Sequence, residues 1–554
     1  MKRIRIYILL SLLSVSSLLL AQSERLKVEL SSSASVSSNS ELNPLWSYSN
    51  QWGIYSQYEQ AELVVHGKAR YDLLDKEVVD LQVGLGVVGS TNFDHSMIHE
   101  AYLKGRFYMI DFTVGMEAFS PLAKYDDLTS GSYLMSSNAR PTPRIGLGIF
   151  DWWSIPYTRD WLQIKGGCYL GMLFDEDNPK YTKDVILHEK FAYGRLGGWY
   201  VKPYLGLVHS VMMGGTSPTG EDIPIDFWAS FLGKRSEKFR DISSMRGEAT
   251  NAAGGHQGLW DMGLDVDFVG NKVHFYYQRM FKDNGGTKPF GTLNKDHIMG
   301  IHVSFNDSKW LSAVSLEWMR TSDQLGDGTP DPIGYDKNGN LIAVYPGDVP
   351  LDDNGFWKWI NSHFTQADIE AWENETGWIL NQWCYLKFLR EHWDNGPHGG
   401  RKNYLNNGLY YQGWSAGGLS IGTPLFHSYT TQVKYMNGEG KTPNYAFFTN
   451  NRVDAITVGL SGGDGNRLSY RLKYTFSKNH GSLCEKYEGG AFGLHRFEDY
   501  FYTTSKKEHY IVINADYKLS ESLSINAMLS ADWGELYDAV ALRIGAKYNI
   551  RVKR

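Results

Sequence analysis

The C-terminal end of the chain consists of three runs in which apolar and polar residues alternate. In the first run, Ile511 and Ile513 share one face while Asn514 belongs to the other, and the runs 522–533 and 540–551 repeat the pattern. Runs of about ten residues with period two, separated by tight turns, have the length of tilted strands that cross a bilayer. A soluble sandwich has the same alternation, so other features must decide between the two.

The N-terminus decides much of this choice, because it has the form of a secretory signal. Three basic residues near the start precede an apolar run from Ile6 to Ala21, which ends in a small residue suited to signal peptidase. The run is shorter than the about 20 apolar residues of a spanning helix, which disfavours a retained anchor. We therefore expect residues 1–21 to be a cleaved signal and residues 22–554 to form one domain.

The composition beyond the signal excludes a helical membrane protein. No run reaches about 18 consecutive apolar residues, and the mean hydropathy is −0.37. A barrel is compatible with this value, because its strands alternate apolar residues with lumen residues. Aromatic residues form 14% of the chain, which fits interfacial girdles and an aromatic lumen; the alternative is an aromatic-rich secreted sugar-binding domain. The net charge of −6 indicates no nucleic-acid partner.

Alternating segments recur along the chain and number roughly sixteen to eighteen, an even number being typical of bacterial single-chain barrels. No fixed-period repeat is visible, which argues against a propeller or a solenoid. The predicted fold class is an all-β antiparallel transmembrane β-barrel in a Gram-negative outer membrane, in contact with lipid and lipopolysaccharide. The segments are 26–38, 62–71, 79–85, 100–107, 162–172, 200–212, 259–268, 273–280, 298–305, 311–319, 453–460, 468–476 and the three C-terminal runs.

Loop lengths set the expected topology, because outer-membrane barrels have short periplasmic turns and long external loops. The short turns at 306–309, 462–467 and 520–522 are predicted to be periplasmic, whereas the segment 479–507 is predicted to be external. The large insertion at about 322–407 then emerges on the outside.

This insertion is the only clear interruption of the regular succession of predicted strands. Its first part, 326–348, is rich in Gly, Asp and Pro and is predicted to be irregular. Its second part is predicted to be helical, because Thr365 and Asp368 have the spacing of a capping box and apolar residues follow at helical spacing. Trp372 and Trp383 on this helix would form a lid or a platform for glycans; the alternative is a helix that only packs on itself to stabilise the loop.

No group of catalytic residues is convincing. The pair His188 and Glu189 lacks the second His of a metalloprotease helix, and no Gly-x-Ser-x-Gly stands between a strand and a helix. His66 and Ser304 lie on predicted strands, but one His and one Ser among so many strands carry almost no specificity. The three cysteines are too scattered for a disulfide framework or a zinc site. We therefore expect no enzyme activity, no cofactor and no metal.

One short segment carries residues suited to ligand binding. Arg140 and Arg144 flank two prolines in an Arg-Pro-x-Pro-Arg word, which rigidifies the backbone and projects two guanidinium forks. With the nearby Asn138, they suit the binding of carboxylates or sugar hydroxyls in a lumen. The alternative is an internal salt-bridge network that fills the barrel.

Several short sequence motifs together resemble those of the capsule assembly Wzi family, and they are spread over most of the mature chain. The resemblance implies an outer-membrane barrel of about eighteen strands that binds surface polysaccharide and helps to assemble or attach capsule without being an enzyme. The family includes members with an N-terminal helical bundle, whereas the segment 26–38 of this chain resembles a strand. The motifs are Met135–Arg144, Pro224–Trp228, Gly247–Gly258, Ile421–Leu425 and Asn450–Val453.

The predicted partner is capsular or exopolysaccharide, whose rings stack on Trp and Tyr and whose hydroxyls bond to Arg, Asn and acidic side chains. Two alternatives remain open: an outer-membrane porin or sugar-specific channel, and a barrel enzyme that acts on lipid or glycan. The candidate polysaccharide-binding residues are Asn138, Arg140, Arg144, Glu248, Asn251, His256, Trp372 and Trp383.

Overall fold

The computed structural model describes most of the chain after the predicted signal. Residues 1–21 lie outside the described ranges, so the cleaved signal stays a prediction. The described residues are 25–76, 78–122, 125–173, 178–282, 295–306, 308–324, 332–335, 341–343, 349–350, 352–395, 403–486 and 497–551.

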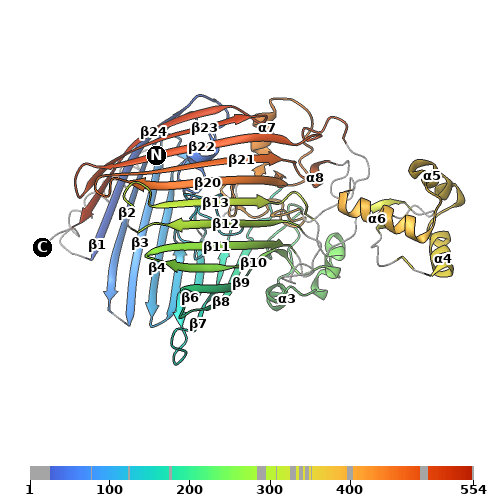
Figure 1. Cartoon of the computed structure of the whole chain (residues 1–554), viewed down its shortest axis with the longest axis horizontal. Helices are drawn as coiled ribbons and strands as arrows, with labels where there is room; N and C mark the ends of the chain where they lie inside the picture. The colour runs from blue at the N-terminus through green and yellow to red at the C-terminus, as the bar shows by residue number, and fades with distance from the viewer. Residues whose placement is uncertain are drawn as a thin grey trace.

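The described residues form one closed sheet of 18 antiparallel strands (Figure 1). Each strand pairs with the next along the chain, and the circle closes where β1 pairs with β24, from Lys27 opposite Arg551 to Ser37 opposite Ala541. This closed barrel confirms the predicted fold class. The strands are β1 (Leu26–Ser37), β2 (Ala61–Asp75), β3 (Val79–Ser90), β4 (Met97–Phe107), β5 (Ile110–Met116), β6 (Arg144–Ser154), β7 (Leu162–Met172), β8 (Ile186–Leu196), β9 (Val201–Met213), β10 (Gly255–Phe268), β11 (Asn271–Phe281), β12 (His297–Ser304), β13 (Ala313–Arg320), β20 (Val453–Gly463), β21 (Leu468–Asn479), β22 (Lys506–Lys518), β23 (Leu523–Gly534) and β24 (Ala539–Arg551).

The wall is apolar on its outside, as the alternation of the C-terminal runs predicts. Ile513, Leu529 and Ile544 point outward and are exposed, while Met528 and Arg543 on neighbouring positions point inward and are buried. An outward apolar face is the surface that a bilayer covers. Exposed aromatic residues gather where the strands meet their short turns, as in an interfacial girdle: Tyr108, Tyr157, Trp161, Trp199, Tyr200, Phe268 and Trp310.

Three strands have no counterpart in the predicted list: β5, β6 and β8. β5 has only seven residues, β6 carries Phe150 and Trp152 on the lumen face as well as apolar residues on the outer face, and β8 carries the polar residues His188 and Lys190 on its outer face. Phe150 of β6 and Phe191 of β8 point inward and join the hydrophobic core. Alternation is lost where the lumen face is packed rather than wet, which explains why these strands were missed.

The two ends of the barrel differ in the length of their connections. At the short-turn end, strands are joined by segments as short as residues 108–109 and 269–270; at the long-loop end, the connections include 214–254 and 321–452. The predicted short turns all lie at the short-turn end. Figure 1 shows the long loops and their helices together on the right. Among the described residues, no helix is both long and apolar enough to cross a membrane.

Three long connections fold back into the barrel and fill its long-loop half. The described residues of these connections, 38–60, 117–122, 125–143 and 403–452, are called the plug below. Tyr133 and Trp414 of the plug are fully buried and share one hydrophobic core with inward side chains of the wall. Wall residues in this core include Phe191, Val208, Leu259, Met280, Met319, Tyr510 and Met528.

Polar groups of the wall hold the plug in place. The Lys473 ammonium on β21 donates to the carbonyl oxygens of Asp126 and Thr129, at 2.9 and 3.1 Å. The backbone N–H of Leu45 donates to the Asp532 carboxylate on β23 at 2.6 Å. Because hydrogen bonds to buried charged groups are stronger than neutral ones, these contacts fix the plug to the wall at two separate places.

The insertion forms its own small helical unit beyond the long-loop end (Figure 1). Its helices are α4 (Asp353–His363), α5 (Gln366–Thr376) and α6 (Gln382–Asn395). The capping box of Thr365 and Asp368 is confirmed. The predicted single helix is nevertheless two helices, because Gly377 takes a left-handed conformation with φ 69° and ends α5. Helix α4 was not predicted at all.

Within the stretch 326–348, predicted to be irregular, the described residues form a small hairpin of β14 (Pro332–Tyr335) and β15 (Leu341–Ala343). The remaining short elements are α2 (Leu45–Tyr48), α3 (Phe227–Leu232), α7 (Tyr429–Met436), α8 (Leu483–Lys486), the 3₁₀ turns η1 (Phe93–His95), η2 (Glu237–Phe239) and η3 (Ser243–Thr250), and the short strands β16 (Ser415–Ala416), β17 (Leu419–Ser420), β18 (His427–Ser428) and β19 (Phe448–Asn450).

Candidate functional site

A cavity of about 520 Å³, called the lumen pocket below, lies between the plug and the short-turn end. Strands β6 to β11 form its walls, and Leu122 and Tyr125 of the plug form its inner end. Its volume falls in the range of about 300–1,000 Å³ that is usual for ligand sites. The lining combines aromatic rings with charges of both signs: Trp152, Tyr193, Tyr204, Lys165, Arg195, Lys202, Lys272, His274, Asp265 and Asp267.

Arg195 is the best anchored charged group of the pocket. Its guanidinium carbon lies 4.3 Å from the centre of the Trp152 ring. One terminal nitrogen is 2.8 Å from the Asp265 carboxylate, and Nε donates to the Gln163 side chain at 2.7 Å. Stacking and two directional bonds together hold the fork in one orientation. The Arg195 and Trp152 pair therefore presents a planar apolar face beside a fixed cation.

The tyrosines of the pocket are fixed by one buried carboxylate. Asp261 on β10 accepts from the Tyr193 hydroxyl at 2.9 Å and lies 3.1 Å from the Tyr204 hydroxyl. The Tyr204 hydroxyl is also 3.0 Å from Nε2 of His274. This network fixes the two rings at their polar ends and leaves their faces as part of the pocket wall.

The inner end of the pocket is rigid because the plug is stacked on the wall. The rings of Tyr125 and His302 are nearly parallel, with centroids 3.6 Å apart. Burial raises the pKa of Tyr125 to about 12, so its hydroxyl stays neutral at physiological pH. The Lys165 ammonium donates to the carbonyl oxygen of Pro121 at 2.5 Å. These contacts hold the plug segment in place at the inner end of the pocket.

Two of the candidate residues from the Arg-Pro-x-Pro-Arg region lie in the plug rather than in the lumen pocket. Asn138 is buried, and its side chain donates to the Ser420 carbonyl oxygen at 2.9 Å. Arg140 packs on Gly417 so closely that a Cβ there would lie 2.9 Å from its Nε. That Nε is buried and has no hydrogen-bond partner among the described residues.

Arg144, the first residue of β6, takes part in an internal network instead. A terminal nitrogen lies 3.5 Å from the Glu189 carboxylate, the other donates to the Phe119 carbonyl oxygen, and the guanidinium sits 4.2 Å from the Tyr169 ring centre. This is the salt-bridge arrangement that the sequence left open as the alternative. A role of these three residues in polysaccharide binding stays a prediction.

The next candidates lie at the long-loop end. The Asn251 side chain is exposed and donates to the Glu248 carboxylate at 3.2 Å. They neighbour α3, because Ala253 donates from its backbone to the Lys234 carbonyl oxygen just after that helix, at 2.9 Å. On α3, the Trp228 side chain is 68% exposed, which makes this an outward aromatic surface.

His256 is different, because it is buried in the wall. Its Nδ1 lies 2.9 Å from Nε2 of His209, and the two rings are stacked with centroids 5.1 Å apart. Its other ring nitrogen lies 3.0 Å from the Ala253 carbonyl oxygen. His256 therefore lies outside the lumen pocket, and its contact with Ala253 ties it to the segment beside α3.

The two tryptophans of the insertion have opposite environments. Trp372 packs against Trp378, Tyr385 and Phe388, within the core of the helical unit. Trp383 is 68% exposed on α6. Self-packing therefore accounts for Trp372, whereas only Trp383 offers an open ring to a glycan.

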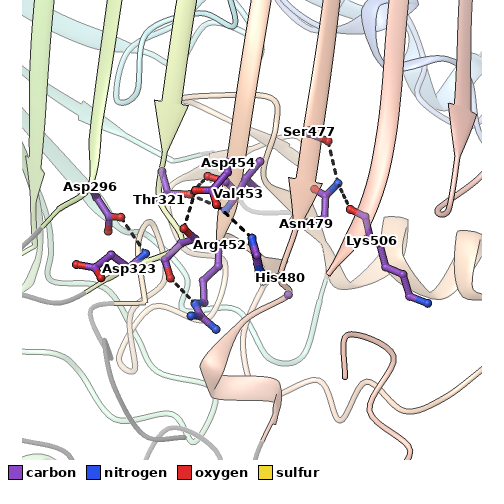
Figure 2. A network of polar contacts seen from close by, with 12 residues as sticks. Asp296, Thr321, Asp323, Arg452, Val453, Asp454, Ser477, Asn479, His480 and Lys506 are labelled. Carbon is purple, nitrogen blue, oxygen red and sulfur yellow. Dashed lines mark hydrogen bonds and ion pairs between the residues drawn. The ribbon is translucent and has the colours of Figure 1, made fainter. Parts of the chain in front are cut away.

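The motif Asn450–Val453 belongs to a polar network at the long-loop rim (Figure 2). Thr321 donates from its hydroxyl to the carbonyl oxygens of Asn451 and Val453, at 3.0 and 3.1 Å, and accepts from the Val453 N–H at 2.8 Å. Arg452 donates to the carbonyl oxygen of Ser322 at 2.9 Å. These bonds tie the start of the insertion to β20.

Two carboxylates take part in this network, Asp454 at its centre and Asp296 at one side, as Figure 2 shows. Asp454 accepts from the Ser322 hydroxyl at 2.6 Å and lies 3.3 Å from Nε2 of His480. Asp296, just before β12, accepts from the backbone N–H of Asp323 at 2.9 Å and from the Tyr404 hydroxyl at 2.9 Å. Asp296 therefore joins both ends of the insertion, and the rim network is a clamp for the loops.

Sequence reasoning missed the residues of the lumen pocket itself. Trp152 and Tyr193 lie on β6 and β8, two strands that were not predicted, and Tyr204 and Asp261 were seen only as strand residues. The signal that could have found them is local: the inward positions of strands β8 to β11 carry both aromatic and charged residues near the short turns.

The closed 18-strand barrel with its apolar outer face places this chain in the class of outer-membrane β-barrels. No known family model matches the sequence, and a search of curated proteins finds no relative. Solved barrels resemble it in fold. The Escherichia coli Wzi protein, described as an outer-membrane protein of group 1 capsule assembly and a carbohydrate-binding barrel, is 11% identical, with 94% of this chain and 83% of that chain covered and a TM-score of 0.47.

Two Pseudomonas aeruginosa barrels are similar to a comparable degree. OccK5 (OpdH) is 9% identical, with 95% of this chain and 98% of that chain covered and a TM-score of 0.41. OprD is also 9% identical, with 95% and 94% covered and a TM-score of 0.41. Likenesses this distant establish neither family membership nor function.

Proposed function

We propose that this chain is a non-enzymatic outer-membrane barrel that binds capsular or exopolysaccharide and assists its assembly or attachment. The observation that carries the proposal is the lumen pocket, in which aromatic faces stand beside ion-paired charged groups. Sugar rings offer apolar faces for stacking and hydroxyls for directional hydrogen bonds. The pocket supplies both kinds of contact, from Trp152, Tyr193 and Arg195 among others.

The charged groups of the pocket favour a polar or acidic saccharide over a simple cation. Arg195 is paired with Asp265, and the Lys202 ammonium is 2.7 Å from the Asp267 carboxylate. Paired groups keep free lone pairs and N–H groups for hydroxyls while their net charge is small. Lys165 and Lys272 also line the pocket, so cations outnumber carboxylates there, and an acidic saccharide segment suits this lining better than an isolated cation does.

The plug supports binding over transport. A diffusion porin keeps a polar lumen filled with water, whereas here Tyr133, Tyr404 and Trp414 are fully buried inside the barrel. The apolar core that they form with the wall leaves space for a pocket rather than a wide pore.

The topology suggests how the two ends are used. By the rule of short periplasmic turns, the lumen pocket faces the periplasm and the surface of α3 with Trp228 and Asn251 faces outward. We place the main saccharide contact in the pocket and a weaker contact of the surface polysaccharide at Trp228. Binding leaves the polysaccharide chemically unchanged.

The test uses the purified full-length barrel in detergent and capsular polysaccharide from the same cells. We expect saturable binding by the wild type, with unchanged polysaccharide length afterwards, and binding about tenfold weaker in Trp152→Ala, a loss of about 1.4 kcal/mol. Trp199→Ala serves as the matched control, because Trp199 lies in a short turn and is 58% exposed.

Planar bilayers separate this proposal from the channel alternative. The wild type should give no stable large conductance. Stable conductance without polysaccharide binding would support the alternative that the chain is a porin. Equal polysaccharide binding by Trp152→Ala and wild type would show that the lumen pocket is not the binding site.

A further inference from the structure

Two histidines and one glutamate meet inside the barrel, away from the lumen pocket. His66 on β2 and His99 and Glu100 on β4 each offer one ligand atom, and these atoms lie within 4.8 Å of one another. The His66 and His99 rings stand edge to face, with centroids 5.2 Å apart. His66 is 7% exposed and His99 is 1% exposed. All three side chains are thus enclosed by protein.

A β-bulge brings two consecutive ligands to the same side of the wall. Gly86 of β3 faces Glu100, and the next residue, Val87, faces Ile98, so His99 is the extra residue. In a regular strand His99 and Glu100 would point to opposite faces, but a bulge redirects one side chain. Both residues are therefore buried inside, while Ile98 stays exposed on the outside.

The histidines carry unused ring nitrogens at this place. Nε2 of His66 and Nδ1 of His99 are buried, and neither has a hydrogen-bond partner among the described residues. Nε2 of His99 is 2.9 Å from the carbonyl oxygen of Trp52 in the plug. That bond places the proton on Nε2 and leaves the Nδ1 lone pair free, which is the usual outer support of a metal-binding His.

We propose that His66, His99 and Glu100 form a binding site for one divalent transition-metal ion, with zinc as its best probe. Two imidazoles and a carboxylate are a common ligand set of zinc sites that keep a fourth position open. At a bond length of about 2.0–2.1 Å, tetrahedral ligand atoms lie about 3.3–3.4 Å apart. Side-chain rotations that move each ligand atom by about 1 Å bring the three atoms of this cluster to those separations.

Lys68 is the group that competes with the metal. Its ammonium is 2.8 Å from Oε2 of Glu100, while Oε1 accepts from the Ala118 N–H at 2.9 Å. A second cavity of about 310 Å³ is lined by Lys68, Glu100 and Tyr102 and gives a route to the carboxylate. Binding of the ion would join β2, β4 and, through His99, the plug at Trp52.

The experiment titrates zinc chloride into untagged, EDTA-treated full-length protein by calorimetry. We expect one ion per chain, binding at least about tenfold weaker in His66→Gln and His99→Gln, and binding about threefold or more tighter in Lys68→Met, since the competing cation is gone. His188→Gln is the matched control and should bind as the wild type, because His188 is also buried with an unpartnered Nε2 but belongs to no such cluster among the described residues.

Cobalt gives an independent readout, since a four-coordinate nitrogen and oxygen site produces visible absorption bands that the His99→Gln variant should lose. Heat-modifiable migration shows whether each variant is folded; if the histidine variants are not, Glu100→Gln and Lys68→Met decide by weaker and tighter binding. Absence of saturable zinc binding, or equal affinity in wild type and folded ligand variants, would overturn the proposal and leave the cluster as packing around the Lys68 ion pair.

Discussion

The guanidinium of Arg195 lies over the indole ring of Trp152, 4.3 Å from the ring centre, and is held there by its bonds to neighbouring polar side chains. The pair comes from two strands, β6 and β8, that lie on either side of β7. Beside Trp152 the register shifts between Ile149 and Trp153, so that three residues of β6 stand opposite one residue of β7, and such a bulge bends the strand. The pocket therefore depends on the geometry of the wall as much as on its residue types.

Replacing Arg195 should show whether binding needs only the positive charge of this side chain or also the planar shape of its guanidinium. Arg195→Lys keeps the cation but loses the planar fork that stacks and bonds in two directions, so we expect polysaccharide binding about three- to tenfold weaker, or about 0.7–1.4 kcal/mol. Arg195→Met should weaken binding further, because Asp265 then loses its partner. Affinities of purified variants measure this. Binding by Arg195→Met equal to that of wild type would show that the saccharide does not use this group.

The rim clamp should weaken as pH rises. Burial raises the pKa of Asp296 to about 7, and the negative charge of Asp323 adds to this shift. In the unfolded chain an Asp titrates near about 3.9. Between these values the folded Asp296 binds more protons than it does in the unfolded chain, so its contribution to the stability of the clamp is greatest at low pH, falls from about pH 4 to about pH 7 and is constant above.

Hydrogen exchange of residues 321–324 and 403–406, corrected for the intrinsic rate at each pH, measures this dependence. Asp323→Asn is the matched control: it keeps the backbone N–H that Asp296 accepts but removes the neighbouring charge, so the transition should move to lower pH. A transition at the same pH in both proteins would mean that another group titrates.

The barrel could be predicted from the sequence because its outward face obeys a simple rule. Positions such as Ile513 and Leu529 must be apolar to face lipid, and the period of two then marks each strand. The rule fails where the plug fills the lumen, since Phe150 and Phe191 make the inner face apolar too. That is why β6 and β8, and with them Trp152, Tyr193 and Arg195 of the pocket lining, were missed.

The candidate site residues show a second limit of prediction from the sequence. Arg144 and His256 were selected by residue type, and both are used in contacts within the protein. His66 carries almost no specificity as a single His on a predicted strand. Its partners His99 and Glu100 come from another strand, and one of them is turned inward by a bulge. Pairing between strands and local register are not visible in a single sequence, so clusters that depend on them require the structure.

Glu317 should contribute strongly to holding the plug against the barrel wall. Its carboxylate accepts from the Ser130 N–H at 3.0 Å, from the Ser130 hydroxyl and from the Tyr276 hydroxyl at 2.5 Å. Glu317→Ala leaves these buried donors unpaired, which costs about 1–3 kcal/mol, and should give brief channel openings in planar bilayers. Glu317→Gln keeps one acceptor oxygen and should be less affected in both measurements. A silent Glu317→Ala barrel of normal stability would show that other contacts hold the plug.

The helical unit of the insertion should be removable without loss of the barrel. Its core of Phe356, Ile360 and Tyr385 is separate from the core of plug and wall, so replacing residues 349–395 by a short Gly-Ser linker should leave heat-modifiable migration unchanged. Within the unit, Trp372→Ala should destabilise the helices by about 1–3 kcal/mol, because the ring is packed on three aromatic neighbours. Trp383→Ala should not, since that ring is exposed; it should instead reduce polysaccharide binding if the unit is a glycan platform. Hydrogen exchange of α4 to α6 and affinity of the two variants separate these roles, and loss of the folded barrel on deletion would show that the unit is part of its stability.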